Sequence, residues 1–173
     1  MGMRKLRLLI PGAIYHVTSR LNNGFMGLKE RPMKILFMEV LRQAHDLFDY
    51  ELLNFTIMDN HFHLLIKPGK ETNLSDLMGW IKSVFAIRWN KAHGSSGHVW
   101  GERFYSRPIK EEDIEELEAI FAYIVDNPVK ANKVKRARDW EYSGLWQYIN
   151  GIKTILKEIP EYVKGMYEVW MRC

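Results

Sequence analysis

The stretch Met58-Asp59-Asn60-His61-Phe62-His63-Leu64-Leu65-Ile66 decides how the rest of the sequence is interpreted. Asp59-Asn60 is a tight-turn dipeptide, and the residues on both sides of it favour strands, so the stretch predicts a hairpin. Successive side chains of a strand point to opposite faces, so His61 and His63 share one face while Phe62 points to the other. Phe62 and the alternate aliphatic residues that follow it can pack against helices. The stretch therefore predicts a strand with one buried face and one face that carries two imidazoles.

The segments around this hairpin predict an α+β fold. The pattern of apolar residues, turn residues and helix caps indicates strands and helices in the order β-α-β-β-α-β, which is the split β-α-β or ferredoxin-like arrangement. We expect an antiparallel sheet with two helices on one face, followed by a third helix and a helical C-terminal tail. The predicted strands span residues 13–20, 52–58, 61–67 and 104–110, and the predicted helices span residues 32–50, 74–93 and 114–127.

Length and composition indicate one globular unit. The chain has 173 residues, of which 47% are apolar and 27% charged, so wholesale disorder is excluded. We expect residues 1–148 to form one domain and residues 149–173 to extend it, with an amphipathic helix from Ile152. The single cysteine, Cys173, excludes an internal disulfide framework and a CxxC zinc site. No apolar run approaches the roughly 18 residues that a membrane span needs, and the start of the chain argues against a signal peptide.

The charge distribution points to a polyanionic partner. The net charge is +4, and the segment that follows the third helix contains five bases and no acid. We expect this segment to contact phosphates, because its charge faces no local acid between Asp126 and Asp139. A solvated loop without a ligand is the alternative that stays open. The five bases are Lys130, Lys133, Lys135, Arg136 and Arg138.

His61 and His63 are the first candidates for metal ligands. Two imidazoles leave a coordination sphere incomplete, and a zinc site of three histidines would need one more ligand. His16 on the first strand is available, although a hydrogen-bonded strand histidine is the simpler interpretation. Two surface histidines on a half-exposed strand remain the alternative to a metal site.

The helix that begins after Asp113 carries two further polar candidates. Its apolar residues form a stripe over about a third of the helix circumference. Tyr123 lies far from the centre of that stripe, and Asn127 lies one turn further on the same side. A phenol and an amide therefore project together from a face that is not the packing face. A boundary tyrosine and a helix-ending asparagine before Pro128 are the alternatives.

Several segments together resemble a known family. The stretch His61-Phe62-His63 looks like the HUH motif (histidine, hydrophobic residue, histidine) of the single-tyrosine transposases. Residues 123–131 resemble the helix that carries their nucleophile. The resemblance spans about residues 3–148 and is strongest to the REP-associated tyrosine transposases. Shorter blocks in the family's order lie at residues 11–17, 97–104 and 142–146.

The resemblance implies an enzyme that cleaves and rejoins single-stranded, hairpin-flanked DNA through a 5′-phosphotyrosine intermediate. Tyr123 would be the nucleophile, His61 and His63 would bind Mg²⁺ or Mn²⁺, and Asn127 would be the third ligand. A divalent cation suits this chemistry because a tyrosine of pKa about 10 is a poor nucleophile at neutral pH. The DNA contacts expected on this basis involve Lys130, Lys133, Lys135, Arg136 and Arg103.

The resemblance also implies a bacterial, cytoplasmic and nucleoid-associated protein that acts as a monomer or a homodimer. Two other functions remain possible on the sequence alone. One is a non-catalytic nucleic-acid-binding protein on a fold like that of the RNA-recognition motif, in which strand aromatics stand where His61 and His63 stand here. The other is an HxH metallohydrolase, which would draw further histidine or aspartate ligands from other strands.

Overall fold

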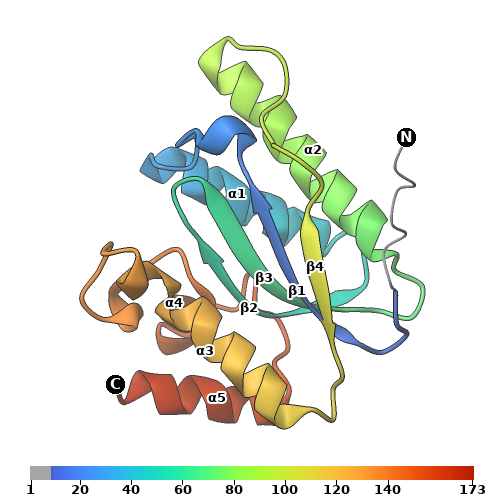
Figure 1. Ribbon diagram of the computed structural model, residues 1–173, viewed down its shortest axis with the longest axis vertical. Helices are drawn as coiled ribbons and strands as arrows, with labels where there is room; N and C mark the ends of the chain where they lie inside the picture. The colour runs from blue at the N-terminus through green and yellow to red at the C-terminus, as the bar shows by residue number, and fades with distance from the viewer. Residues whose placement is uncertain (1–8) are drawn as a thin grey trace.

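The computed structural model describes residues 9–173. Its centre is a four-stranded antiparallel sheet in the order β2-β3-β1-β4. Two helices, α1 and α2, lie behind the sheet in Figure 1, and α3 crosses in front of its lower part. The strands are β1 (Ile14–Arg20), β2 (Tyr50–Ile57), β3 (His61–Pro68) and β4 (Tyr105–Ile109). The helices are α1 (Arg31–Ala44), α2 (Leu74–His93), α3 (Ile114–Lys130), α4 (Gly144–Ile149) and α5 (Glu161–Met171), with short 3₁₀ turns at Asn22–Gly24 and Ala137–Asp139.

The predicted ferredoxin-like order is confirmed, and local signals explain where two of the helices begin. The Asn73 side chain accepts hydrogen bonds from the amides of Ser75 and Asp76 at the start of α2. The Asp113 side chain does the same for the amide of Glu116 at the start of α3. Such caps satisfy amides that have no partner within the helix. Helix α2 ends as predicted just before Gly94, whose left-handed conformation a glycine adopts without a steric penalty.

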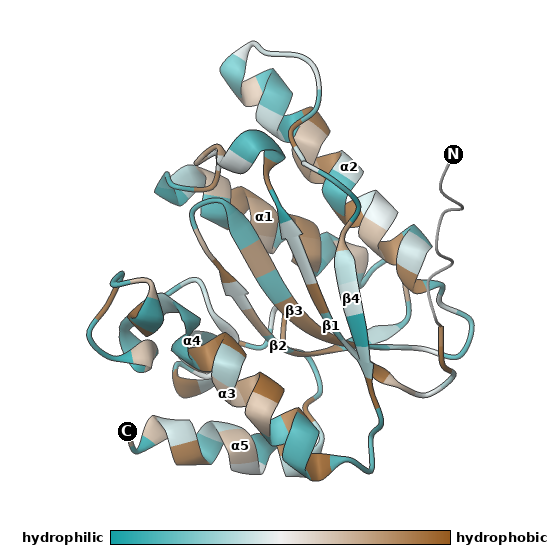
Figure 2. Cartoon of the chain, viewed as in Figure 1, coloured by the Kyte–Doolittle hydropathy of each residue, from teal (hydrophilic) through white to brown (hydrophobic). Residues whose placement is uncertain are grey.

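The core between the sheet and the α1–α2 pair is aromatic at its centre. Phe62 of β3 stacks on Phe37 of α1, with 4.7 Å between ring centroids, and Phe85 and Trp100 pack edgewise around them. Phe62 has no exposed surface, as its place in the alternating pattern predicts. The hydropathy colouring of Figure 2 shows apolar residues along the strands and on the helix faces turned toward them.

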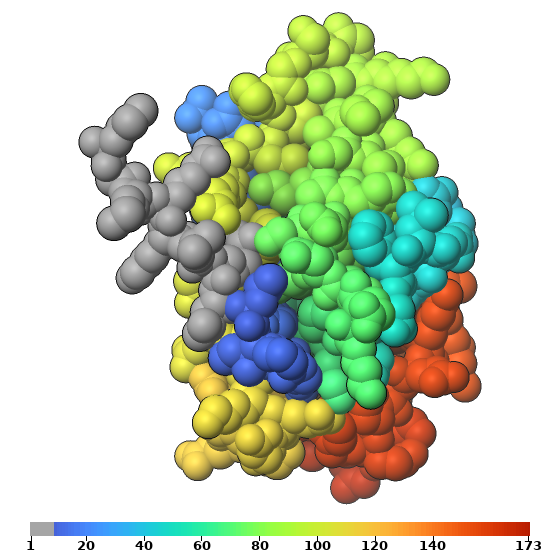
Figure 3. Space-filling model, turned by 90° about the vertical axis from the view of Figure 1, so that its right-hand side faces the viewer, coloured from blue at the N-terminus to red at the C-terminus, as the bar shows by residue number. Residues whose placement is uncertain are grey.

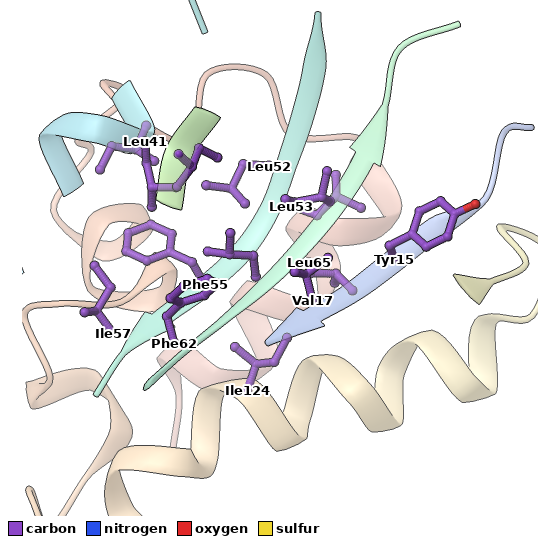
Figure 4. Packing of buried hydrophobic residues seen from close by; sticks show 14 of the residues in the cluster. Tyr15, Val17, Leu41, Leu52, Leu53, Phe55, Ile57, Phe62, Leu65 and Ile124 are labelled. Atoms are coloured by element: carbon purple, nitrogen blue, oxygen red, sulfur yellow. The ribbon is translucent and has the colours of Figure 1, made fainter. Parts of the chain in front are cut away.

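Helix α3 covers part of the opposite sheet face. Ile124 points from α3 toward β1 and β3 (Figure 4) and is completely buried. Phe121, which is buried on the same side of α3, packs edgewise on Tyr167 of α5 at 4.8 Å between ring centroids. The apolar stripe of α3 is therefore buried by the sheet and the C-terminal helix together.

Three predicted boundaries are wrong. Helix α1 ends at Ala44 rather than near Tyr50, because Tyr50 begins β2 and its hydroxyl donates to the Leu41 carbonyl. Helix α3 continues through Pro128 to Lys130. A proline this close to the end of a helix removes only one helical hydrogen bond, so it does not force the helix to stop earlier.

The third boundary is in the tail, where α5 begins at Glu161 and not at Ile152. The intervening segment is irregular and runs beside the α1–β2 connection (Figure 3). The ring of His45, in that connection, is hydrogen-bonded at 2.8 Å to the carbonyl of Ile155 in the segment. No helix within residues 9–173 has both the length and the hydropathy that crossing a membrane requires.

Candidate active site

The strand register places the two motif histidines on the sheet face that α3 partly covers. His63 lies opposite Thr18 of β1, and His61 lies opposite Arg20. The two imidazoles are neighbours, with 5.1 Å between ring centroids. Phe62, between them, points into the core on the other face. The face predicted for each of these side chains is therefore confirmed.

His63 has one ring nitrogen with a partner and one without. Its Nδ1 lies 2.9 Å from Nε2 of His16, a hydrogen-bonding distance, and the two rings are stacked. Its Nε2 is buried and has no hydrogen-bond partner in the described part of the chain. A buried polar atom without a partner is costly, so this nitrogen is suited to binding a ligand. His16 is thus the hydrogen-bonded strand histidine of the simpler interpretation, and it fixes the orientation of the His63 ring.

His61 is oriented by its neighbours in a similar way. Its Nδ1 donates to the side-chain oxygen of Asn60 at 2.7 Å, so Nε2 is the ring nitrogen that carries the lone pair. The Asn127 side chain is close enough to this ring to raise its pKa, against the larger effect of burial. Asn60 of the turn therefore orients His61, and Asn127 of α3 is its neighbour.

Burial keeps all three imidazoles neutral. It lowers the pKa of His63 to about 3, with further contributions from His61, His16 and Arg20. Burial and the charge of Arg20 lower the pKa of His61 to about 4, and burial and Arg107 lower that of His16 to about 4. A neutral imidazole is the form that binds a metal ion, so no proton has to be displaced at neutral pH.

Helix α3 brings Tyr123 and Asn127 to these histidines. The Tyr123 ring centroid lies 5.3 Å from that of His63 and 5.9 Å from that of His16. The residue is 42% exposed, so it is partly open to solvent. Because Asn127 follows one turn later, both side chains face the imidazoles when the apolar stripe of α3 packs on the sheet.

The residues present fit a divalent cation for which protein side chains fill only part of the coordination sphere. Within residues 9–173, no group of three or more His, Cys, Asp or Glu side chains is arranged to hold a metal ion. A site here would combine the imidazoles of His61 and His63 with the amide oxygen of Asn127. Such a set leaves positions for phosphate and water, which Mg²⁺ and Mn²⁺ readily accept.

The basic segment after α3 is largely engaged in ion pairs. Lys130 pairs with Asp126 at 3.3 Å, and Arg136 pairs with Asp139 at 2.9 Å. Arg138 donates to the carbonyls of Met171 and Cys173. The expectation that this charge faces no acid is therefore wrong, because the acids that flank the segment fold back onto it.

Lys133 has a partner that the local sequence does not show. It pairs with Asp59 of the β2–β3 turn, which is 74 residues away in the chain. Asp59 also accepts at 2.7 Å from Lys34, whose side chain is only 2% exposed. Of the five bases, Lys135 is the one for which the structure shows no hydrogen bond or ion pair. Arg103 is exposed in the segment before β4, beside Lys82 and Trp100.

Sequence reasoning missed Asp59 and Arg20 as residues of the site. Asp59 joins the turn that carries Asn60 and His61 to both α1 and the end of α3. Arg20, at the end of β1, lies beside His61. The only local signal was their position, next to the motif for Asp59 and at the end of a predicted strand for Arg20.

Comparisons with known proteins identify the family and agree with the fold. The sequence model of the family described as "Transposase IS200 like" matches residues 11–127. The fold resembles the structure of a REP-associated tyrosine transposase bound to a REP hairpin, at 20% sequence identity and a TM-score of 0.72 over 92% of this chain and 93% of that one. A candidate transposase from Deinococcus radiodurans matches more weakly, at 17% identity and a TM-score of 0.46 over 70% of this chain and 97% of that one. No curated protein matches.

Proposed function

Because the chain belongs to the IS200-like transposase family, we propose that it cleaves and rejoins single-stranded DNA through a covalent bond to Tyr123. One observation carries this proposal. The ring of Tyr123, which is partly exposed on α3, lies 5.3 Å from the ring of His63, measured between centroids. The Nε2 atom of His63 is buried and has no hydrogen-bond partner in the described part of the chain. This arrangement supports the proposal, because Tyr123 would be the nucleophile and the unpartnered nitrogen would face a phosphate-binding ion.

The proposed reaction exchanges one phosphodiester for another. The Tyr123 hydroxyl loses its proton and attacks the scissile phosphorus, a new O–P bond forms, and the bond to the 3′ oxygen breaks to leave a 3′ hydroxyl. Attack by a 3′ hydroxyl on the phosphotyrosine reverses these steps and rejoins the strand. The linkage energy is conserved throughout, so no nucleotide cofactor is needed, and the sequence contains no GxxxxGK[ST] motif.

Each side chain has a proposed role in this reaction. A bound Mg²⁺ or Mn²⁺ would supply neutralisation of the phosphate charge and orientation of the scissile group. His61, His63 and Asn127 would hold it. His16 and Asn60 orient the two imidazoles through the hydrogen bonds described above.

For the substrate, we propose hairpin DNA with a single-stranded flank, recognised as in the REP-associated branch. The solved relative that is bound to a REP hairpin supports this. Arg103 and Lys135 are exposed and remain proposed DNA contacts, whereas Lys130, Lys133 and Arg136 would first have to leave an acidic partner. Both histidines, Tyr123 and Asn127 come from one chain, so the proposed site needs no second copy and a monomer suffices.

The test is a covalent adduct that depends on Tyr123. Wild-type protein incubated with Mn²⁺ and hairpin oligonucleotides should give a protein–DNA band on a denaturing gel. Tyr123→Phe should abolish this band while hairpin affinity stays within about twofold, since one exposed oxygen is lost and folding changes by less than about 1 kcal/mol.

The other outcomes separate the alternatives. An adduct that survives Tyr123→Phe contradicts the assignment of the nucleophile. DNA that is bound and never cut points to a non-catalytic nucleic-acid-binding protein, and cut DNA without any adduct points to a metallohydrolase.

A further inference from the structure

Beside the candidate site, one row of side chains crosses the sheet to its open edge. Thr18 of β1 is paired with His63 on one side and with Tyr105 of the edge strand β4 on the other. Cross-strand partners point to the same face, so Tyr105 shares the face of the histidines, about 10 Å from His63 across two strand spacings. Arg20, two residues after Thr18, lies opposite His61 on the same face. We call Thr18, Arg20 and Tyr105 the β1–β4 strip.

The strip lies on β1 and β4, whereas α3 packs mainly on β2 and β3. The end of β1 and the start of β4 are in the upper part of the sheet in Figure 1. Further along β4, Arg107 lies opposite His16 and is tied to Glu116 of α3 by an ion pair. That ion pair marks the side of the strip on which α3 begins.

Tyr105 is exposed without a structural reason. The residue is 57% exposed, which is the largest fraction for any Phe, Trp or Tyr within residues 9–173. Tyr123, the proposed nucleophile, is exposed to a smaller extent at 42%. A large ring left open to solvent beside a site is a typical feature of a surface that stacks on bases.

Arg20 is a cation that the described part of the chain leaves without an acidic partner. It is exposed and makes no hydrogen bond or ion pair there through its side chain. Its charge nevertheless acts on both imidazoles, because it lowers the pKa of His61 and of His63. An anion bound near the histidines could pair with Arg20 without breaking a native contact, in contrast to Lys130, Lys133 and Arg136.

We propose that the β1–β4 strip binds the single-stranded nucleotide next to the scissile phosphate, with the Tyr105 ring stacked on its base and the Arg20 guanidinium on its phosphate. This inference rests on the proposed function, because it takes Tyr123 as the point of cleavage. It adds a subsite that holds the flank of the hairpin across the sheet edge. Stacking tolerates any base, so the strip positions the strand and does not select a sequence.

The test measures binding without cleavage. Labelled hairpins with a 5′ extension, a 3′ extension or no single-stranded extension are titrated with full-length protein in EDTA, and affinity is followed by fluorescence anisotropy. Tyr105→Ala should weaken binding of one extended hairpin by about fivefold or more, and Tyr105→Phe should stay within about twofold because it keeps the ring. Binding of the hairpin without an extension should not change.

The arginine is tested by the salt dependence of the same affinity. Arg20→Gln should lower the slope of log affinity against log salt by about 0.7, the contribution of one phosphate contact on a single strand. Arg172→Gln removes the same charge from the exposed C-terminal end and is the matched control, with an unchanged slope expected. Thermal unfolding followed by circular dichroism checks that each variant is folded.

The position of the base is read with 2-aminopurine placed at successive positions of the extension. Quenching at the nucleotide next to the cleavage position, lost in Tyr105→Ala and kept in Tyr105→Phe, supports the assignment. If Tyr105→Ala and Arg20→Gln leave affinity, slope and quenching unchanged while wild type still forms the Tyr123-dependent adduct, the strip is overturned and the proposed function stands. If wild type neither binds the extended hairpins nor forms the adduct, both are overturned.

Discussion

The unpartnered Nε2 of His63 has an energetic consequence. A buried polar atom without a hydrogen bond costs about 1–3 kcal/mol, and the neighbouring hydrogen bond to His16 prevents the ring from turning to relieve it. Binding of a cation would remove this cost at His63, whereas no buried side-chain atom of His61 or Asn127 is left without a partner in the described part of the chain. The three proposed ligands should therefore differ in how much they contribute to metal affinity.

We expect His63→Ala to abolish measurable Mn²⁺ binding at pH 7.5 and Asn127→Ala to weaken it by about 10-fold or more, since an amide is a weaker ligand than an imidazole. Isothermal titration calorimetry of Mn²⁺ into the free protein measures this without DNA. His93→Ala is the control, because His93 is exposed on α2 and its ring nitrogen bonds only to the Trp89 carbonyl. Equal Mn²⁺ affinity for wild type and His63→Ala would contradict the proposed site.

At the residue scale, the sequence predicted which side chains share a sheet face and missed how the charges pair. The face shared by His61 and His63 follows from strand alternation, which is a local property. The ion pair between Lys133 and Asp59 joins residues 74 positions apart, so the count of nearby charges gave the opposite expectation for Lys133. The contact of His16 with His63 likewise depends on the pairing of β1 with β3.

At the scale of the element, α3 depends on its cap and on its apolar stripe. The Asp113 carboxylate accepts from the amide of Glu116, and Glu116 in turn pairs with Arg107 of β4. Tyr123 lies more than two turns further along the helix. The first turn and the candidate site are therefore separable.

We expect Asp113→Ala to lower the free energy of unfolding by about 1 kcal/mol, the usual cost of removing an N-cap. Urea denaturation followed by circular dichroism measures this. Adduct formation by Tyr123 should change by less than about twofold, because fraying is confined to the first turn. Asp113→Asn, which keeps an acceptor oxygen, should recover most of the lost stability. A loss of adduct with unchanged stability would show that the first turn itself takes part in the reaction.

Element boundaries could be predicted wherever a side chain caps its own helix. Asn73, Gly94 and Asp113 set the ends of α2 and the start of α3 at the expected residues. The helix ends that were predicted wrongly depend on contacts with distant residues or on a proline that the last turn of a helix can accommodate. Tyr50 was predicted to end the first helix and is instead the first residue of β2. Pro128 was predicted to stop α3 and is instead accommodated in its final turn.

At the scale of the molecule, the tail joins the core to the back of the nucleophile-bearing helix. Tyr167 of α5 has no exposed surface, and its hydroxyl donates to the Leu53 carbonyl at 2.8 Å. Its ring packs against Phe121 of α3 and stacks on Tyr148 of α4. Residues 149–173 therefore contribute to the core, although the docking position of their helix could not be predicted from the sequence.

Removing Tyr167 should accordingly affect the whole fold. Tyr167→Phe leaves the Leu53 carbonyl without this partner and should cost about 1–3 kcal/mol. Tyr167→Ala also opens a cavity beside Phe121 and should cost about 3–5 kcal/mol, measured by urea denaturation. Tyr162→Phe, on the same helix, is the matched control: its hydroxyl donates to Glu111 near the surface, and its loss should cost less than about 1 kcal/mol.

Because Phe121 and Tyr123 lie on the same turn of α3, Tyr167→Ala should also slow adduct formation under conditions in which the variant is still folded. A variant as stable and as active as wild type would show that α5 is dispensable and that the sheet alone positions α3.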